Sequence, residues 1–133
     1  MAREKKIIDA SVAVKWFVEE QGSDKAMILR DEHISGKITL VAPELIFLEV
    51  LNALRYKKID AETLTKINTA LWDTQMHIEK LNQNLLEKSA ETALKYNLSL
   101  YDAIYLVLAN SFGTLLVTAD TALAKTPNAI LLK

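Results

Sequence analysis

Short apolar runs alternate with longer amphipathic segments along the whole chain, and this alternation limits the possible folds more than any other feature. A short apolar run bounded by turn residues is typical of a buried strand, whereas helical spacing over a longer segment is typical of a helix. Strands that alternate with helices form parallel sheets whose faces are covered by those helices. The sequence therefore predicts an α/β fold, namely a three-layer α/β/α domain with a central parallel sheet of about five short strands.

The expected elements begin and end at capping or helix-breaking residues, because Ser and Asp favour helix N-caps, Pro suits a first turn and Gly suits a helix end. The expected strands are Lys6–Ile8, Ile38–Val41, His77–Lys80, Leu115–Val117 and an edge strand at Ile130–Leu132. The expected helices are Ser11–Val18, Asp24–Ser35 capped by Ser23 and stopped by Gly36, Pro43 to about Lys57, Asp60 to about Thr74, Asn84–Tyr96, Leu100–Phe112 opened by Ser99 and ended by Gly113, and a short one capped by Asp120 before Pro127.

The composition is that of one globular domain over residues 1–133. Half of the residues are hydrophobic, a quarter are charged, and no repeat or linker is visible. Cysteine is absent, which excludes disulfides, thiolate zinc sites and cysteine nucleophiles. The net charge of −1 provides no overall basic field that would attract a polyanion.

Nothing in the chain predicts insertion into a membrane. Only two apolar residues separate the basic start from Asp9, too few for a secretory signal, and the uncharged stretch 103–119 is shorter than the roughly 20 apolar residues that span a bilayer. Asn110, Ser111 and Gly113 interrupt that stretch. We expect a cytoplasmic protein.

Four carboxylates stand alone in apolar surroundings: Asp9, Glu49, Asp102 and Asp120. A buried carboxylate without a partner either becomes protonated or binds a cation. Ligands of open parallel sheets bind beyond the carboxyl ends of the strands, where the strand order reverses. Asp9 and Asp120 follow expected strands, and the other two lie in neighbouring helices, so all four can converge at one end of the sheet.

Each acid also has a purely structural interpretation. Asp9 and Asp120 can be N-caps, and Asp102 lies three residues after Ser99, the spacing of a capping box. Glu49 is harder to explain in this way, because Leu45, Leu48 and Asn52 share its face on a largely apolar helix. Capping and cation binding are compatible, since a carboxylate has two oxygens.

Oxygen donors without thiolate or clustered imidazole favour Mg²⁺ or Mn²⁺. His33 and His77 lie far from the acids in sequence, and we expect ordinary surface or partly buried positions for them. Arg55, Lys57 and Lys58 with Tyr56 form a basic cluster that we interpret as a solvated helix end. Lys15, six residues after Asp9, is a candidate substrate-binding residue.

The acids lie in four motifs that resemble those of PIN-domain ribonucleases, and most closely those of VapC-type toxins of prokaryotic toxin–antitoxin pairs. The motifs are IIDASVAVKWFVEE at Ile7–Glu20, PELIFLEVLNAL at Pro43–Leu54, SLYDAIYLVLA at Ser99–Ala109 and LLVTADTAL at Leu115–Leu123. They occur in order and cover nearly the whole chain. Thr121 is a departure, because some relatives have a further acid after the position of Asp120, and it leaves open whether one or two metals bind.

The resemblance implies a single PIN-like domain and a metal-dependent endoribonuclease that leaves a 5′-phosphate and a 3′-hydroxyl. Asp9, Glu49, Asp102 and Asp120 become the metal-binding and catalytic acids, with Glu49 either a ligand or a general base. Ser11, Asn52 and Thr118 match supporting polar positions. The implied partners are RNA, a small VapB-type antitoxin and a second copy of the chain in a homodimer.

Three other classes of protein lack required residues in this chain. A dehalogenase-type phosphatase needs a second Asp where Ser11 stands, a receiver domain needs a phospho-accepting Asp where His77 begins its segment, and P-loop or dinucleotide folds need glycine motifs that the three glycines cannot form. The remaining alternatives are a housekeeping ribonuclease and a catalytically weak or inactive PIN-like module that binds RNA or a protein partner.

Overall fold

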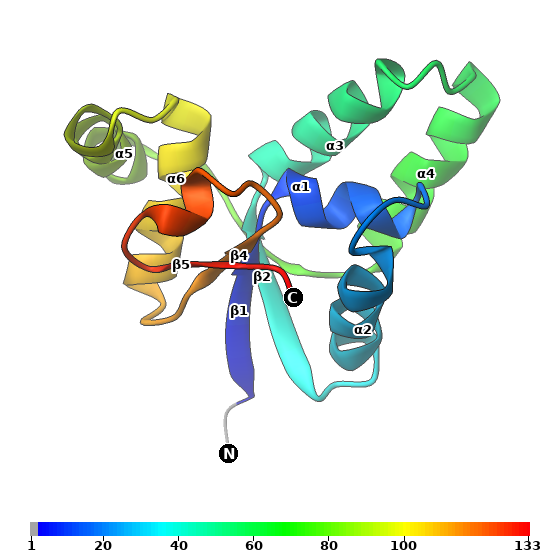
Figure 1. The fold of residues 1–133 in the computed structure, drawn as a ribbon, viewed down its shortest axis with the longest axis horizontal. Helices are drawn as coiled ribbons and strands as arrows, with labels where there is room; N and C mark the ends of the chain where they lie inside the picture. Colours follow the sequence, from blue (N-terminus) through cyan, green and yellow to red (C-terminus); the bar gives the residue numbers. More distant parts are fainter. Residues whose placement is uncertain (1–2) are drawn as a thin grey trace.

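The computed structural model describes residues 3–133, so Met1 and Ala2 of the expected domain lie outside it. Over these residues, five strands form one parallel sheet in the order β3-β2-β1-β4-β5. Helices flank both faces, which confirms the three-layer α/β/α prediction (Figure 1). The strands are β1 (Glu4–Ile8), β2 (Ile38–Pro43), β3 (His77–Glu79), β4 (Leu116–Thr118) and β5 (Ala129–Leu131). The helices are α1 (Ala10–Ala13), η1 (Val14–Trp16), α2 (Ser23–Ile34), α3 (Leu45–Arg55), α4 (Ala61–Asp73), α5 (Gln83–Tyr96), α6 (Leu100–Ser111) and η2 (Leu123–Lys125).

The two faces of the sheet build two hydrophobic cores because neighbouring residues of a strand point to opposite faces. Ile8 and Leu40 pack against α1, α2, α3 and α4, on the right of Figure 1. Ile7, Val41 and Leu116 pack against α5, α6 and η2 on the left. These strand residues have no exposed surface. The sheet is therefore a buried platform from which the loops at its carboxyl edge project.

The strand order reverses between β1 and β4, since the chain passes from β1 to β2 and β3 on one side and returns to the other side for β4. Ile8 pairs with Val117, so the two strands end level with each other. Asp9 and Thr118 consequently lie side by side at the carboxyl edge. This is the expected place for a ligand site.

Several expected helix starts are confirmed in detail. Asp9 accepts a hydrogen bond from the Val12 N–H, Asp60 accepts one from Thr63, and the Ser99 hydroxyl accepts one from Asp102. These caps were predictable because a capping contact spans only three residues.

Other boundaries differ from the prediction. Pro43 was expected in the first turn of a helix, but it is the last residue of β2, paired with Glu79. A proline can be the last residue of a strand because the only ladder group it lacks is the backbone N–H. The next residue, Glu44, donates its backbone N–H to the Glu79 carbonyl. Ser23 does not cap α2, whose N-cap position is Gly22 in the left-handed conformation. The Ser23 hydroxyl instead accepts from the Glu20 N–H and donates to the Val18 carbonyl.

The helix expected over Ser11–Val18 is a single α turn followed by a 3-10 turn. The two histidines occupy structural positions, as expected. His33 accepts a hydrogen bond from the Leu40 N–H and contacts the Thr74 carbonyl, while the exposed His77 pairs with Glu79. In the part of the chain that is described, no helix has both the length and the apolar character needed to cross a bilayer.

Candidate metal-binding active site

Asp9 is the most deeply buried of the four acids, with 5% of its surface exposed. It leaves the end of β1 and caps α1, so the fold fixes its backbone on both sides. Its Oδ1 accepts hydrogen bonds from the Ser11 hydroxyl at 2.5 Å and the Val12 N–H at 3.4 Å, and its Oδ2 accepts one from the Thr118 hydroxyl at 2.5 Å. Burial raises the pKa of Asp9 despite these bonds, and the charge of Asp102 raises it further.

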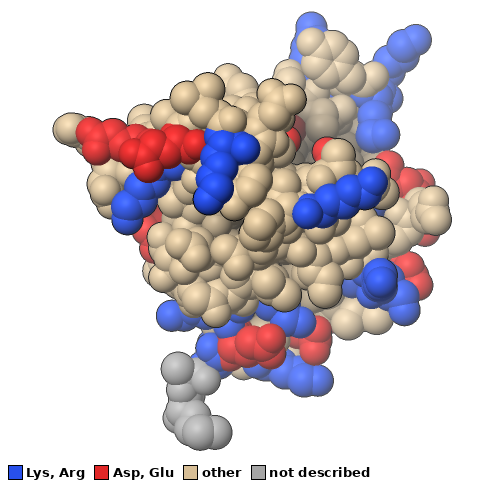
Figure 2. All heavy atoms as spheres, turned by 60° about the vertical axis from the view of Figure 1, so that its left-hand side comes forward, with Lys and Arg blue, Asp and Glu red and all other residues tan. Residues whose placement is uncertain are grey.

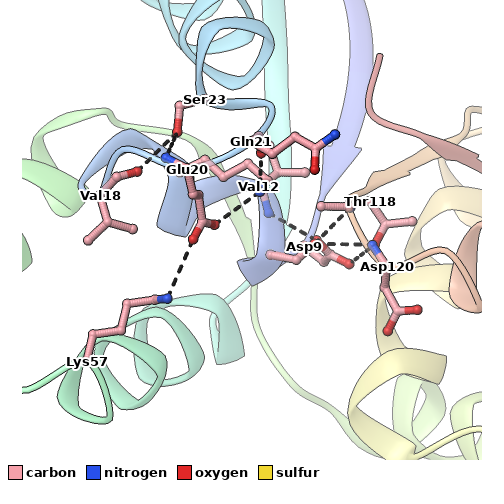
Figure 3. Close-up of polar contacts among 12 residues, drawn as sticks. Asp9, Val12, Val18, Glu20, Gln21, Ser23, Lys57, Thr118 and Asp120 are labelled. Atoms are coloured by element: carbon pink, nitrogen blue, oxygen red, sulfur yellow. Dashed lines mark hydrogen bonds and ion pairs between the residues drawn. The ribbon is translucent and has the colours of Figure 1, made fainter.

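Two hydroxyl groups join the end of β1 to the end of β4. Ser11 Oγ accepts a hydrogen bond from the Ala119 N–H at 2.9 Å while it donates to Asp9. Thr118 Oγ1 accepts from the Asp120 N–H at 3.1 Å while it also donates to Asp9 (Figure 3). Each hydroxyl thus orients the buried carboxylate and fixes the loop that carries Asp120.

Glu49 lies on α3 and is half-buried. Its Oε1 accepts a 2.7 Å hydrogen bond from the hydroxyl of Tyr105, a residue of α6 that is only 1% exposed. Burial raises the pKa of Glu49 against the effect of this bond, and the charges of Asp102 and Asp9 raise it further. Leu48, expected to share a buried face with Glu49, is 69% exposed. The apolar face of α3 is narrower than its sequence indicates.

Asp102 lies in the first turn of α6, and Asp120 lies in the loop after β4. Burial raises the pKa of Asp102, and the nearby charge of Asp120 adds to the shift. Asp120 is exposed, and its Oδ1 accepts hydrogen bonds from the N–H groups of Ala122 and Leu123. It therefore caps the turn that leads into η2, whose N-cap position is Ala122 and not the expected Asp120, and it leaves its Oδ2 without a contact of this kind among the described residues.

The acids form a chain of electrostatic neighbours. Asp9 interacts with Asp102, Asp102 with Asp120, and Glu49 with both Asp9 and Asp102. Within residues 3–133, however, no three acidic or histidine groups lie close enough together to form a complete metal-binding group. The donors are all hard oxygens, and repulsion between the acids adds to burial in raising the pKa values of Asp9, Glu49 and Asp102, so the residues fit a divalent cation in chemistry.

A hollow of about 440 Å³ adjoins Glu49 and runs along α3. Ser11, Asn52, Lys15 and Glu20 also line it. Lys15 Nζ is held by Glu20 Oε1 at 3.1 Å and by the Gln21 carbonyl at 2.7 Å. The ammonium group of this candidate substrate-binding residue is thus already engaged by the protein.

Glu20 also reaches Lys57 Nζ at 3.5 Å, so it bridges the segment after η1 to the end of α3 (Figure 3). Burial acts to raise the pKa of Glu20, but Lys15 and then Lys57 outweigh it and lower the pKa. Sequence reasoning missed Glu20 and Tyr105. Tyr105 had one available signal, since it follows Asp102 by three residues on the same helix face.

Comparison with protein families supports this assignment of motifs. The model of the PIN domain family matches residues 6–129, which is most of the chain. A comparison with curated proteins gives no significant match.

Solved structures share the fold at low sequence identity. A protein of Pyrobaculum aerophilum superposes with a TM-score of 0.73 and 22% identity, over 97% of this chain and 84% of that one. VapC20 of Mycobacterium tuberculosis, described as a sarcin-ricin loop cleaving toxin, superposes with a TM-score of 0.70 and 14% identity, over 89% of this chain and 92% of that one. A chain of a toxin–antitoxin complex from Klebsiella pneumoniae superposes with a TM-score of 0.71 and 19% identity, over 94% of this chain and 95% of that one. The family match and the shared fold together show that this chain belongs to the PIN domain family.

Proposed function

We propose that this chain is a metal-dependent endoribonuclease and the toxin of a toxin–antitoxin pair. The observation that supports the proposal is that Asp9 and Asp120 follow β1 and β4 at the switch point of the sheet with Asp102 and Glu49 as electrostatic neighbours, and that burial and mutual repulsion raise the pKa values of three of these acids. The structures of similar fold support the toxin assignment, because two of them are described as a VapC toxin and a toxin–antitoxin complex.

The residues that would hold Mg²⁺ or Mn²⁺ are Asp9, Asp102 and Asp120, with Glu49 beside them. Asp9 is rigidly placed by its hydrogen bonds, whereas Asp120 is exposed and belongs to a loop, so Asp120 is the acid best able to move inward. A bound divalent ion supplies an activated water and neutralises charge on the phosphodiester. Glu49 would be available to take up the proton of such a water, because Tyr105 occupies only one of its oxygens.

The test is cleavage of single-stranded RNA by the purified chain in the absence of any partner. We expect cleavage with Mg²⁺ or Mn²⁺, none with chelator, and none for Asp102→Asn, which should keep its fold by circular dichroism. Asp73→Asn, an exposed acid at the end of α4, is the matched control and should cleave normally. Equal cleavage by the wild type and Asp102→Asn would indicate a contaminating nuclease and favour a binding module.

The antitoxin part of the proposal rests on charge as well as on the related structures. A cluster of acids with raised pKa values attracts cationic side chains, and a partner Arg could form paired hydrogen bonds to Glu49 or Asp120 in competition with the metal. We expect expression of the chain alone to slow bacterial growth and co-expression of its genomic neighbour to restore it. A growth defect that persists in Asp9→Asn would argue against toxicity by RNA cleavage, and an adjacent gene without effect would favour a housekeeping ribonuclease.

We also propose a homodimer. The face formed by α5, α6 and β5 shows a broad uncharged centre, with charged side chains mainly near its margin (Figure 2). Large apolar side chains are exposed on α5 and α6, including Leu94, which is 87% exposed. Exposed apolar side chains of this size are common at association sites.

A further inference from the structure

We propose that the end of α3 is a stacking platform for unpaired RNA, in which Tyr56 holds a base of the strand that flanks the cleaved bond and Arg55, Lys57 and Lys58 surround the adjacent phosphates. This inference rests on the proposed ribonuclease function and adds where, and in what form, the flanking strand binds. The α3–α4 arm, residues 45–73, extends away from the sheet at the upper right of Figure 1. Blue side chains gather around uncharged atoms at the corresponding far corner of Figure 2.

Tyr56 is aligned with the acid site along α3. It follows Glu49 by seven residues and keeps helical backbone angles, so it returns to nearly the same helix face about 10 Å farther along the axis. Asn52 lies between them and lines the hollow that begins at Glu49. The hollow reaches Ala53, three residues before Tyr56 on the same helix, so a strand whose phosphate sits at the acids has only a short distance to cover from the end of the hollow to the Tyr56 ring.

The Tyr56 side chain has the chemistry of a base-stacking residue. It is 73% exposed, and the guanidinium of Arg55 lies 5.5 Å from the centroid of its ring. Stacking of bases on aromatic rings beside cationic side chains is how proteins bind single strands without reading their sequence. In a paired duplex the base faces are already stacked, so this surface favours unpaired RNA.

The cations at this end exceed what the surrounding acids neutralise. Lys57 shares Glu20 with Lys15, and the nearby Glu62 pairs with Lys66 on α4. Asp60 is engaged by the Thr63 N–H. Arg55 and Lys58 make no salt bridge within 4 Å among the described residues.

Lys58 is also in the left-handed conformation, with φ of 61°. A helix end of this shape normally carries Gly or Asn, because a side chain with a Cβ is strained there. The chain thus has a lysine where a glycine would be more stable. Gln75, after α4, also has a positive φ, so the case for phosphate binding rests on the charge of Lys58 and not on its conformation.

Binding measurements on the Asp102→Asn protein test the platform, because this background prevents cleavage of the probe. With a labelled, unstructured RNA oligonucleotide and fluorescence anisotropy, we expect Tyr56→Ala to weaken binding by about tenfold, within the range for loss of one stacked base. Tyr56→Phe, which keeps the ring, should bind normally. Tyr56→Ala should have little effect on binding of a blunt RNA duplex.

Lys58→Gly separates a binding role from a structural one. Relief of backbone strain should raise the melting temperature, while loss of the cation should weaken RNA binding and reduce its dependence on salt. Lys58→Arg should retain both RNA affinity and salt dependence. Lys88→Ala, on α5 in the opposite layer, is the control for loss of one surface cation.

The outcomes distinguish this inference from the proposed function. If the wild type cuts RNA but Tyr56→Ala and Lys58→Gly bind single strands with unchanged affinity, the platform is refuted and the ribonuclease stands. If RNA binding depends on Tyr56 but no RNA is cut under any metal condition, the platform stands and the ribonuclease function fails. Failure of the Asp102→Asn protein to bind RNA at all, or an effect of Tyr56→Ala only on a protein partner, would also overturn the platform.

Discussion

The hydroxyl of Tyr105 donates a 2.7 Å hydrogen bond to Glu49 Oε1 and thereby ties α6 to α3 at the acid cluster. Burial, together with the charge of Glu49, raises the pKa of Tyr105 well above its usual range. The Tyr105 hydroxyl therefore stays protonated, and able to donate this hydrogen bond, to a higher pH than that of an ordinary tyrosine. The hydrogen bond holds Glu49 Oε1 in place and thereby also sets the direction in which Oε2 points. Tyr105 is therefore a positioning residue for Glu49.

Tyr105→Phe should lower kcat for RNA cleavage by about tenfold with little change in KM, because Glu49 loses its orientation but the RNA-binding surface is untouched. The unfolding free energy should fall by only about 1 kcal/mol, because Glu49 is half-buried and water can replace the lost donor. Steady-state kinetics and urea denaturation measure the two effects. Tyr101→Phe, an exposed tyrosine on the same helix, is the control. An unchanged kcat with a raised KM would contradict the positioning role.

The sequence allowed prediction of those features that depend on nearby residues. Asp9, Asp60 and Ser99 cap helices through contacts three residues away, and the alternation of strands and helices was enough to expect Asp9 and Asp120 just beyond two strands. The bond between Tyr105 and Glu49 joins residues 56 positions apart, and no local pattern encodes it. Pro43 was misassigned because proline suits both a first helical turn and a strand end, and only the pairing with β3 decides between them.

Saturating Mn²⁺ or Mg²⁺ should raise the melting temperature of the wild type. A ligand that binds only the native state adds about 2.7 kcal/mol at 100 times its dissociation constant. Asp9→Asn should abolish most of this shift and should stabilise the metal-free protein, because it removes the most buried of the repelling charges. Differential scanning calorimetry with and without chelator measures both effects. A wild type without any metal-dependent shift would exclude the site as described.

The stability of the metal-free protein should depend on pH through Asp9. Its pKa is raised in the folded state, so between the ordinary value of about 4 and the raised value the native protein binds more protons than the unfolded chain. The contribution of this group to stability is therefore present at low pH and is lost as pH rises through that window.

Comparison with Asp9→Asn isolates this contribution, because asparagine does not titrate. With chelator present, the stability advantage of Asp9→Asn over the wild type should be largest near neutral pH and shrink as the pH is lowered toward 4. Urea denaturation across this range provides the measurement. An advantage that is constant with pH, or that grows toward acid, would show that Asp9 is not destabilised by its charge.

Thr118→Val should destabilise the protein by about 1–3 kcal/mol, because valine keeps the side-chain shape but leaves Asp9 Oδ2 and the Asp120 N–H without their buried partner. Thr118→Ser keeps the hydroxyl and should cost only about 1 kcal/mol for the lost methyl group. Chemical denaturation of the metal-free proteins ranks the two variants. If serine proved as damaging as valine, packing of the methyl group rather than the hydroxyl would hold this part of the site.

Leu94→Glu should shift the chain from dimer to monomer. Leu94 is 87% exposed on α5, and a buried interface there would force the new carboxylate out of water without a partner. Light scattering after size-exclusion chromatography measures the mass, and circular dichroism should show an unchanged fold because the free protein exposes this position. Ile34→Glu, at a 63% exposed position at the end of α2, is the matched control and should remain dimeric. Dissociation by Ile34→Glu but not by Leu94→Glu would place the interface on the α2 side of the sheet and rule out the α5–α6 face.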